Sequence, residues 1–276
     1  MSKVVVLRSG TSAQLNPECS GFAHGFGIFE TIRIADGRLE FWRAHYERFL
    51  QSASVFGLHL NQSEESLLQA IRELIQSEKR RDGIVKLSLL KDGTGAGCYV
   101  YTRPMITTEG AVNIGLSKQS PLNEHSLLAG HKTHNYMESA LLKQSAVKTG
   151  FFDVVRLNTA KHIAETAMAN LFLVKDNILY TPNLLTGILP GIIRAEVLEI
   201  AEQNSIRFEE GHYLVDFLKA ADAAFLTNSS FGILSVCSFE AGDFSVTFDT
   251  SSTVVEILET ALSDAKKSKS IALTDE

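Results

Sequence analysis

The sequence predicts an α/β protein with two domains. Short β-branched or alternating segments, which are typical of strands, recur between longer segments with apolar residues at helical spacing. The length of 276 residues suits one large domain or two moderate ones. A polar stretch after Pro104 interrupts the pattern and is the best candidate for a boundary. We therefore predict a smaller α/β domain over 1–105, a linker over 106–112 and a larger α/β domain over 113–276.

Composition and charge exclude several classes of protein. Hydrophobic residues make up 45% of the chain and charged residues 21%, as in ordinary globular proteins. The net charge of −6, without a basic stripe that includes aromatics, excludes a nucleic-acid surface. No apolar run reaches the roughly 18 residues of a membrane span, and the N-terminal apolar run is too short for a signal peptide. Three widely spaced cysteines, Cys19, Cys98 and Cys237, fit a reducing cytosol, so we expect a cytoplasmic protein.

The first domain is expected to combine two hairpins with two helices. A short β-branched run predicts a strand over 4–7, and an irregular, glycine-rich stretch predicts a loop over 15–27. Alternation predicts a hairpin over 27–41 that turns at Asp36-Gly37. Apolar residues at helical spacing predict helices over 42–57 and 63–79, the second capped by Ser63. A second hairpin is predicted over 83–101. Its glycine-rich tip is flanked by strands on both sides, which argues against a nucleotide-binding loop.

The second domain is expected to alternate short strands with helices. Strands are predicted over 112–117, 152–157, at Ile163, and over 171–174, 178–180, 206–209 and 223–226. Helices are predicted from the region of Lys132 to about Gly150, from Pro190 to about 204, over 215–220 and over 253–265.

Lys132 is the first candidate for chemistry. It follows the turn Ala129-Gly130 and would stand at the edge of a helix that carries Tyr136 and Ala140. Partial desolvation at such a junction lowers the pKa of a lysine, and the neutral amine can then form a Schiff base with a carbonyl. The alternative is a solvated surface lysine. His131 and His134 lack the adjacent glutamate of a zinc motif, so we expect no metal site.

Several other polar groups could either bind a cofactor or have an ordinary structural role. Arg48 lies three residues after His45 on a helix, where it could bind a phosphate or simply be solvated. Glu165 lies among small apolar residues, where a carboxylate needs a partner unless it is exposed at a sheet edge. The backbone N–H groups of Gly191, Ile192 and Ile193 at a helix start could bind a phosphate, and the polar turn 227–230 offers further donors.

In this order, these segments resemble the fold type IV enzymes of pyridoxal phosphate (PLP), the class IV aminotransferase family. The resemblance rests on HGFGIFETIR, HYERF, HKTHNY, the stretch from Glu165 to Phe172, GILPGIIR and LTNSSFG, and it runs from about Gly25 to Val236. It implies a two-domain fold like that of D-amino acid aminotransferase and a homodimer. It also implies that Lys132 holds PLP and that Glu165 pairs with the pyridine nitrogen. The implied cofactor-binding set is Arg48, Lys132, Tyr136, Glu165, Ile192, Ile193, Asn228 and Ser229.

The same resemblance favours the aminodeoxychorismate lyase branch, which converts 4-amino-4-deoxychorismate to 4-aminobenzoate and pyruvate for folate synthesis. Ile193 and the turn after Leu226 are more like the lyases. Against this, Lys91 and Ala96 stand where those lyases commonly carry arginines, and Phe26 replaces a usual aspartate. A branched-chain or D-amino acid aminotransferase stays open, as does a non-catalytic small-molecule-binding protein on the same scaffold.

Overall fold

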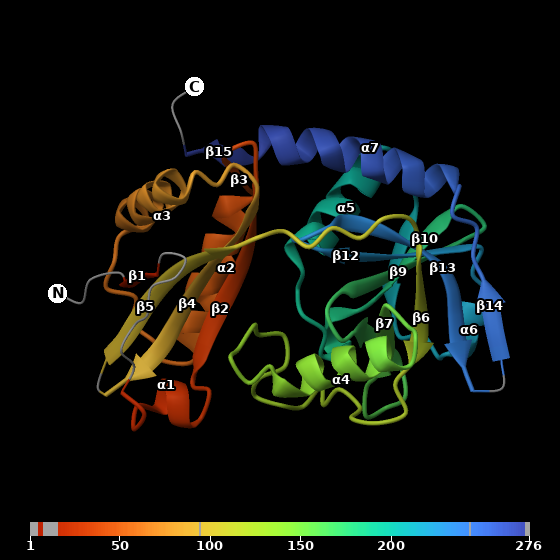
Figure 1. Cartoon of the computed structure of the whole chain (residues 1–276). Helices are drawn as coiled ribbons and strands as arrows, with labels where there is room; N and C mark the ends of the chain where they lie inside the picture. The colour runs from red at the N-terminus through yellow and green to blue at the C-terminus, as the bar shows by residue number, and fades with distance from the viewer. Residues whose placement is uncertain (1–4, 8–15, 94, 243, 274–276) are drawn as a thin grey trace. The chain divides into compact units, whose positions relative to one another are not determined.

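The computed structural model describes residues 5–7, 16–93, 95–242 and 244–273. They form two compact units, and Figure 1 labels most of their helices and strands. Unit 1 contains the described residues up to Ile106, the segment His131–Asn135 and the described residues from Lys266 onward. Unit 2 contains Thr107–Gly130 and Tyr136–Ala265.

Within the described residues, unit 1 is a six-stranded sheet with helices on one face. The strand order is β1-β5-β4-β2-β3-β15. The strands are β1 (Val5–Leu7), β2 (Gly27–Ala35), β3 (Arg38–Glu40), β4 (Gly83–Asp92), β5 (Gly95–Arg103) and β15 (Ser270–Ala272). The helices are α1 (Ser20–Ala23), α2 (Trp42–Val55) and α3 (Glu64–Glu78).

The core of unit 1 lies between its sheet and the helices α2 and α3. Ile28 and Ile32 of β2 are buried in one cluster with Trp42 of α2 and Leu67 and Ile71 of α3. Because side chains alternate along a strand, Phe29 and Thr31 point to the opposite face of the sheet, whereas Glu30 lies on the same face as these isoleucines.

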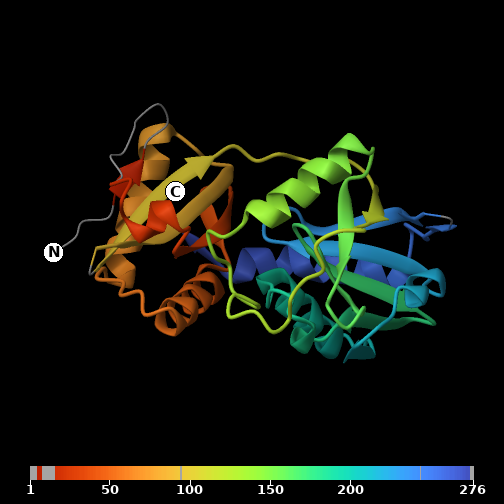
Figure 2. The same cartoon turned by 90° about the horizontal axis from the view of Figure 1, so that it is seen from below.

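Unit 2 is built on a larger mixed sheet. Its described strands follow the order β11-β10-β9-β12-β13-β6-β7-β8, with β14 paired to β13. They are β6 (Val112–Leu116), β7 (Asp153–Leu157), β8 (Ile163–Thr166), β9 (Asn170–Lys175), β10 (Ile178–Pro182), β11 (Phe208–Gly211), β12 (Ala223–Asn228), β13 (Gly232–Ala241) and β14 (Phe244–Thr247). Figures 1 and 2 show α4 (Met137–Lys148) and α5 (Ile192–Gln203) on opposite sides of this sheet. The 3-10 turn η1 (Leu184–Thr186), α6 (Asp216–Lys219) and α7 (Thr253–Ser268) complete the chain.

Both predicted hairpins and the predicted helices around 42–57, 63–79 and 253–265 are confirmed, with shifts of a few residues at their ends. Ser63 caps α3 as predicted, because its hydroxyl accepts a hydrogen bond from the Ser66 N–H. The described part of the predicted loop 15–27 differs from the prediction, since it contains the one-turn helix α1. Val4, predicted as the first residue of a strand, lies outside the described residues.

The division into units differs from the predicted domains in two places. The predicted end of the first domain, residue 105, lies next to the division after Ile106. However, His131–Asn135 belongs to unit 1, because Thr133 pairs with Ile28 of β2. The C-terminal strand β15 also joins unit 1, by pairing with β3. The expectation that the C-terminal domain carries Lys132 is therefore wrong.

Candidate active site

Lys132 lies in an extended segment that pairs with the first residues of β2. The N–H of Phe29 donates to the Lys132 carbonyl at 2.9 Å, and the N–H of His134 donates to the Gly27 carbonyl at 2.8 Å. These bonds keep the segment out of the helix, and α4 begins only at Met137 with Tyr136 as its N-cap. The prediction that Lys132 stands at a helix edge is therefore wrong. Its Nζ lies 4.7 Å from the centroid of the Phe29 ring.

Arg48 is held by a buried carboxylate rather than by solvent. Its Nε donates to Glu30 Oε1 at 2.8 Å and its Nη2 donates to Glu30 Oε2 at 2.7 Å. His45 Nδ1 lies 2.8 Å from the same Oε2. Burial opposes ionisation of Glu30, but the charges and hydrogen bonds of Arg48 and His45 outweigh it and hold the pKa of Glu30 well below its usual range. The solvated alternative for Arg48 is thereby excluded.

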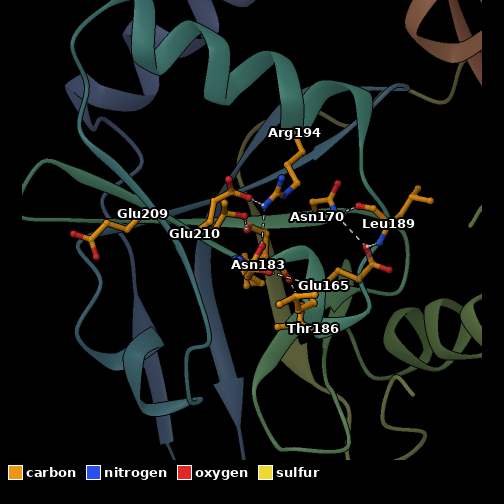
Figure 3. A network of polar contacts seen from close by, with 12 residues as sticks. Glu165, Asn170, Asn183, Thr186, Leu189, Arg194, Glu209 and Glu210 are labelled. Carbon is orange, nitrogen blue, oxygen red and sulfur yellow. Dashed lines mark hydrogen bonds and ion pairs between the residues drawn. The ribbon is translucent and has the colours of Figure 1, made fainter. Parts of the chain in front are cut away.

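Glu165, on β8, is fixed by two hydrogen bonds to one carboxylate oxygen. Oε2 accepts from Asn170 Nδ2 at 3.0 Å and from the Leu189 N–H at 3.1 Å. Asn170 Nδ2 also donates to the Leu189 carbonyl at 2.9 Å, so the three residues form a closed group (Figure 3). This geometry differs from that of a freely exposed glutamate at a sheet edge.

Tyr136 belongs to the electrostatic surroundings of Glu165. Burial, followed by the carboxylates of Glu165 and Asp153, raises the pKa of the Tyr136 hydroxyl above its usual value. The hydroxyl donates to the sulfur of Met168 at 3.3 Å. Tyr136 is therefore a neutral phenol across the physiological pH range.

The start of α5 differs from the prediction by two residues. Pro190 precedes the helix and Gly191 is its N-cap, so the first-turn N–H groups belong to Ile192, Ile193 and Arg194 rather than to Gly191–Ile193. The backbone passes very close to β9 at this point, because a Cβ on Gly191 would lie 2.1 Å from Asn170 Oδ1. Arg194 turns away and bonds the Pro182 carbonyl and Glu210 (Figure 3).

The end of β12 lies beside Asn170, the residue that contacts Glu165 and Gly191. Thr227 pairs with Asn170 across the sheet. Its hydroxyl is buried and finds no hydrogen-bond partner among the described residues. After the strand, Asn228 Oδ1 accepts from the N–H groups of Ser230 and Phe231, which shapes the turn that carries Ser229.

The structure therefore collects the predicted residues into two groups. Arg48 and Lys132 lie in unit 1, and both neighbour β2. Tyr136, Glu165, Ile192, Ile193, Asn228 and Ser229 lie in unit 2, where Asn170 links Glu165, Gly191 and β12. Their roles toward PLP stay predictions.

The sequence analysis missed two residues of this site. Glu30 is part of the motif FETIR, but nothing in that motif indicated that its carboxylate pairs with Arg48. Asn170 was noted only as part of a segment. No local signal could have shown its contacts, because its partner Leu189 lies 19 residues away in the sequence.

Comparison with known proteins identifies the class. The model of the class IV aminotransferase family matches residues 27–239, and the chain belongs to this family. Its two-unit α/β architecture is that of a fold type IV PLP enzyme, as predicted.

The individual relatives have different activities. The D-alanine aminotransferase of Bacillus licheniformis is 30% identical over 81% of this chain and 82% of its own length. The aminodeoxychorismate lyase of Vibrio harveyi is 30% identical over 82% of this chain and 88% of its own. A Legionella pneumophila structure, provisionally assigned as a 4-amino-4-deoxychorismate lyase, is 27% identical with a TM-score of 0.86 over 95% of this chain and 99% of that one. The branched-chain aminotransferase of Escherichia coli shares the fold, with a TM-score of 0.84 over 95% of both chains at 20% identity.

The chain is thus an enzyme of the class IV family, related to both lyases and aminotransferases. Among the described residues, no helix has the length and apolar character needed to cross a membrane.

Proposed function

We propose that this enzyme is a PLP-dependent lyase that converts 4-amino-4-deoxychorismate to 4-aminobenzoate and pyruvate. The observation that carries the proposal is the likeness to the Legionella protein, which extends over nearly the whole of both chains. The apolar Ile193 in the first turn of α5 and the Thr-Asn-Ser-Ser segment, which begins at the end of β12, support the lyase branch. Lys91 and Ala96, directly opposite each other in the second hairpin, favour the aminotransferases.

The residues of unit 2 fit the phosphate of PLP. A buried hydroxyl without a partner, as at Thr227, costs free energy unless a ligand satisfies it. The N–H groups of Ile192 and Ile193 at the start of α5 favour an anion, and Gly191 leaves room for the close backbone approach. We assign the phosphate to these groups together with Asn228 and Ser229. The phosphate-binding role of Arg48 in unit 1 stays a prediction from the family resemblance. Glu165 would bind the pyridine nitrogen, and Tyr136 would complete the cofactor-binding set.

Lys132 would hold PLP and then move the proton. When bound, PLP supplies an electron-withdrawing ring that acidifies the C–H bond beside the substrate amine. Lys132, displaced by the substrate amine, would remove that proton as a general base. The bond from the neighbouring ring carbon to the enolpyruvyl oxygen then breaks, and the ring becomes aromatic. Lys132 would return its proton to the departing enolpyruvate, which gives pyruvate.

The direct test is to incubate the purified, PLP-loaded enzyme with 4-amino-4-deoxychorismate and no 2-oxo acid. We expect equal amounts of 4-aminobenzoate and pyruvate, and at least about a 10²-fold loss of rate in Lys132→Ala. Transfer of the amino group from D-alanine or leucine to 2-oxoglutarate, without 4-aminobenzoate, would instead establish an aminotransferase, which the relationship to the Bacillus enzyme supports. Absence of both reactions would favour a non-catalytic binding protein.

We also propose a cytoplasmic homodimer. Several large apolar side chains of unit 2 are exposed in the single chain, among them Leu127, Met137 and Leu141. Met137 and Leu141 are four residues apart on α4 and therefore lie on the same side of that helix. An exposed apolar surface of this kind favours association with another protein surface. Sedimentation analysis should give the mass of two chains, and Leu141→Lys should shift it toward one chain.

A further inference from the structure

The segment that carries Lys132 contacts the helix α2 as well as the strand β2. The antiparallel bridge between Thr133 and Ile28, with the hydrogen bond from the Phe29 N–H, places Lys132 opposite Phe29. Side chains alternate along an extended segment. The side chain of Lys132 therefore lies on the Phe29 face of the pair, and that of its neighbour His131 lies on the face that α2 covers.

His131 is held against α2 by a hydrogen bond and a ring contact. Its Nδ1 lies 2.9 Å from Ser52 Oγ, and its ring centroid lies 4.9 Å from that of Phe56, the C-cap of α2, with the two planes at 73°. Ser52 is buried, which limits competition from water for this hydrogen bond. Burial also lowers the pKa of His131, so its ring is neutral above pH 7. In the neutral ring Nδ1 can donate or accept, and the Ser52 hydroxyl can take the other role.

The same helix is joined to β2 by a separate contact. Arg48 lies four residues before Ser52, on the same side of α2, and its guanidinium bonds both carboxylate oxygens of Glu30. Three links therefore join α2, β2 and the segment of Lys132 in a closed ring. They are this ion pair, the backbone bonds of the segment to β2 and the hydrogen bond of Ser52. Without the last link, the segment is held to β2 alone.

We propose that Ser52 and His131 are positioning residues, whose hydrogen bond fixes the backbone at Lys132 and so holds the Lys132 amine where it reaches the aldehyde of PLP. This inference rests on the proposed function, in which Lys132 holds PLP. The bond that forms joins Nζ to the aldehyde carbon, with the loss of one water. Both residues act through Lys132, and we assign neither of them a contact with the cofactor. A small displacement of a reacting group is enough to weaken such chemistry.

The experiment compares two ligands of the full-length protein after its PLP has been removed. One is PLP, and the other is 4′-deoxypyridoxine 5′-phosphate, which keeps the ring and the phosphate but has a methyl group in place of the aldehyde. Only PLP can form a bond to Lys132, so only its affinity depends on where that amine lies. In spectroscopic titrations, Ser52→Ala should bind PLP about three- to tenfold more weakly than the wild type, the effect of one hydrogen bond. It should bind the analogue as tightly as the wild type does.

Three further variants test whether the two side chains act as a pair. Ser54→Ala, which changes an exposed serine of the same helix, should bind both ligands like the wild type. His131→Leu should lose as much PLP affinity as Ser52→Ala, and the double variant should lose no more, because one bond is removed in each case. His131→Asn places an amide group where Nδ1 lies and should recover part of the PLP affinity.

The outcomes separate this proposal from the proposed function. Equal PLP affinities in Ser52→Ala and the wild type would overturn it. Equal losses for PLP and for the analogue would overturn it too, because the hydrogen bond would then support the fold or the ring and phosphate site rather than Lys132. Losses that add in the double variant would contradict a shared role. Neither ligand is an amine substrate, so failure of the lyase reaction with a selective loss of PLP affinity would overturn only the lyase assignment. Melting curves set a titration temperature at which every variant is folded.

Discussion

The two units differ in the kind of chemical groups that their predicted cofactor-binding residues present. In unit 1 the groups are ionisable side chains, with Arg48 and Glu30 buried against each other and Lys132 close by on Phe29. In unit 2 they are largely backbone N–H groups at the start of α5 and neutral side chains after β12, with Glu165 held by an amide.

This difference determines how each unit responds to substitution. Removing one member of a buried ion pair leaves the other charge without a partner, which is strongly destabilising. Backbone N–H groups survive a change of side chain, and they are lost only when the backbone itself moves. We therefore expect larger effects from substitutions in unit 1 than in unit 2.

Glu30→Gln should have the largest effect on stability. Its neutral amide removes the buried carboxylate charge that Arg48 and His45 contact, so the free energy of unfolding in urea should fall by about 3–5 kcal/mol. Glu47→Gln is the matched control. It breaks an ion pair with Arg43 in which both side chains are well exposed, and it should cost less than about 1 kcal/mol. Equal losses of unfolding free energy in the two variants would show that the buried ion pair of Glu30 contributes no more to stability than the exposed ion pair of Glu47.

The ion pair of Glu30 also predicts that the free energy of unfolding depends on pH. The pKa of Glu30 is lowered in the folded protein, so its ionised form stabilises the fold at pH values above the ordinary carboxyl value of 4.5. This contribution is lost as the pH falls through the lower, folded-state pKa. The difference in unfolding free energy between wild type and Glu30→Gln should be constant from about pH 6 to 8 and become smaller below about pH 4.5. A difference that instead grows on acidification would contradict the ion pair.

Arg48→Ala should have the next largest effect, on cofactor binding. Loss of a charged hydrogen-bond donor should weaken PLP binding by about 2 kcal/mol in a spectroscopic titration. Arg48→Lys keeps the charge and should recover part of the loss, while Arg43→Ala on the exposed side of α2 should change nothing. Unchanged PLP affinity in Arg48→Ala would limit Arg48 to its structural role with Glu30.

Gly191→Ala tests the backbone site of unit 2 and should have the smallest effect. The added Cβ would lie 2.1 Å from Asn170 Oδ1, so Asn170 must shift and its bond to Glu165 weakens. We expect PLP binding to weaken by about 1 kcal/mol, the lower end of the cost of overpacking. Gly95→Ala is the control, because the nearest atom to its added Cβ would be 3.8 Å away. Equal PLP affinities in the two variants would argue against a close approach at Gly191.

The local structure of the chain was largely predictable, and its long-range contacts were not. The hairpin at Asp36-Gly37 and the cap at Ser63 follow from turn and capping preferences of a few neighbouring residues. The position of Lys132 was mispredicted, because hydrogen bonds to β2, about 100 residues earlier, override the helical pattern that follows it. The motif identified Lys132 and Glu165 as candidates. The roles of Glu30, His131 and Asn170 depend on partners that no local pattern shows.

The central claim is that Lys132 carries the cofactor, and Lys86, whose Nζ lies 3.9 Å from the centroid of the same Phe29 ring, is its natural competitor. Borohydride reduction of the PLP-loaded protein makes the lysine–cofactor linkage permanent, and mass spectrometry of a digest then identifies the modified residue. We expect one phosphopyridoxyl group, on Lys132, and none in Lys132→Ala, whereas Lys86→Met should be labelled at Lys132 as fully as the wild type. Labelling at Lys86 or another lysine, or no labelling of the wild type, would contradict the account.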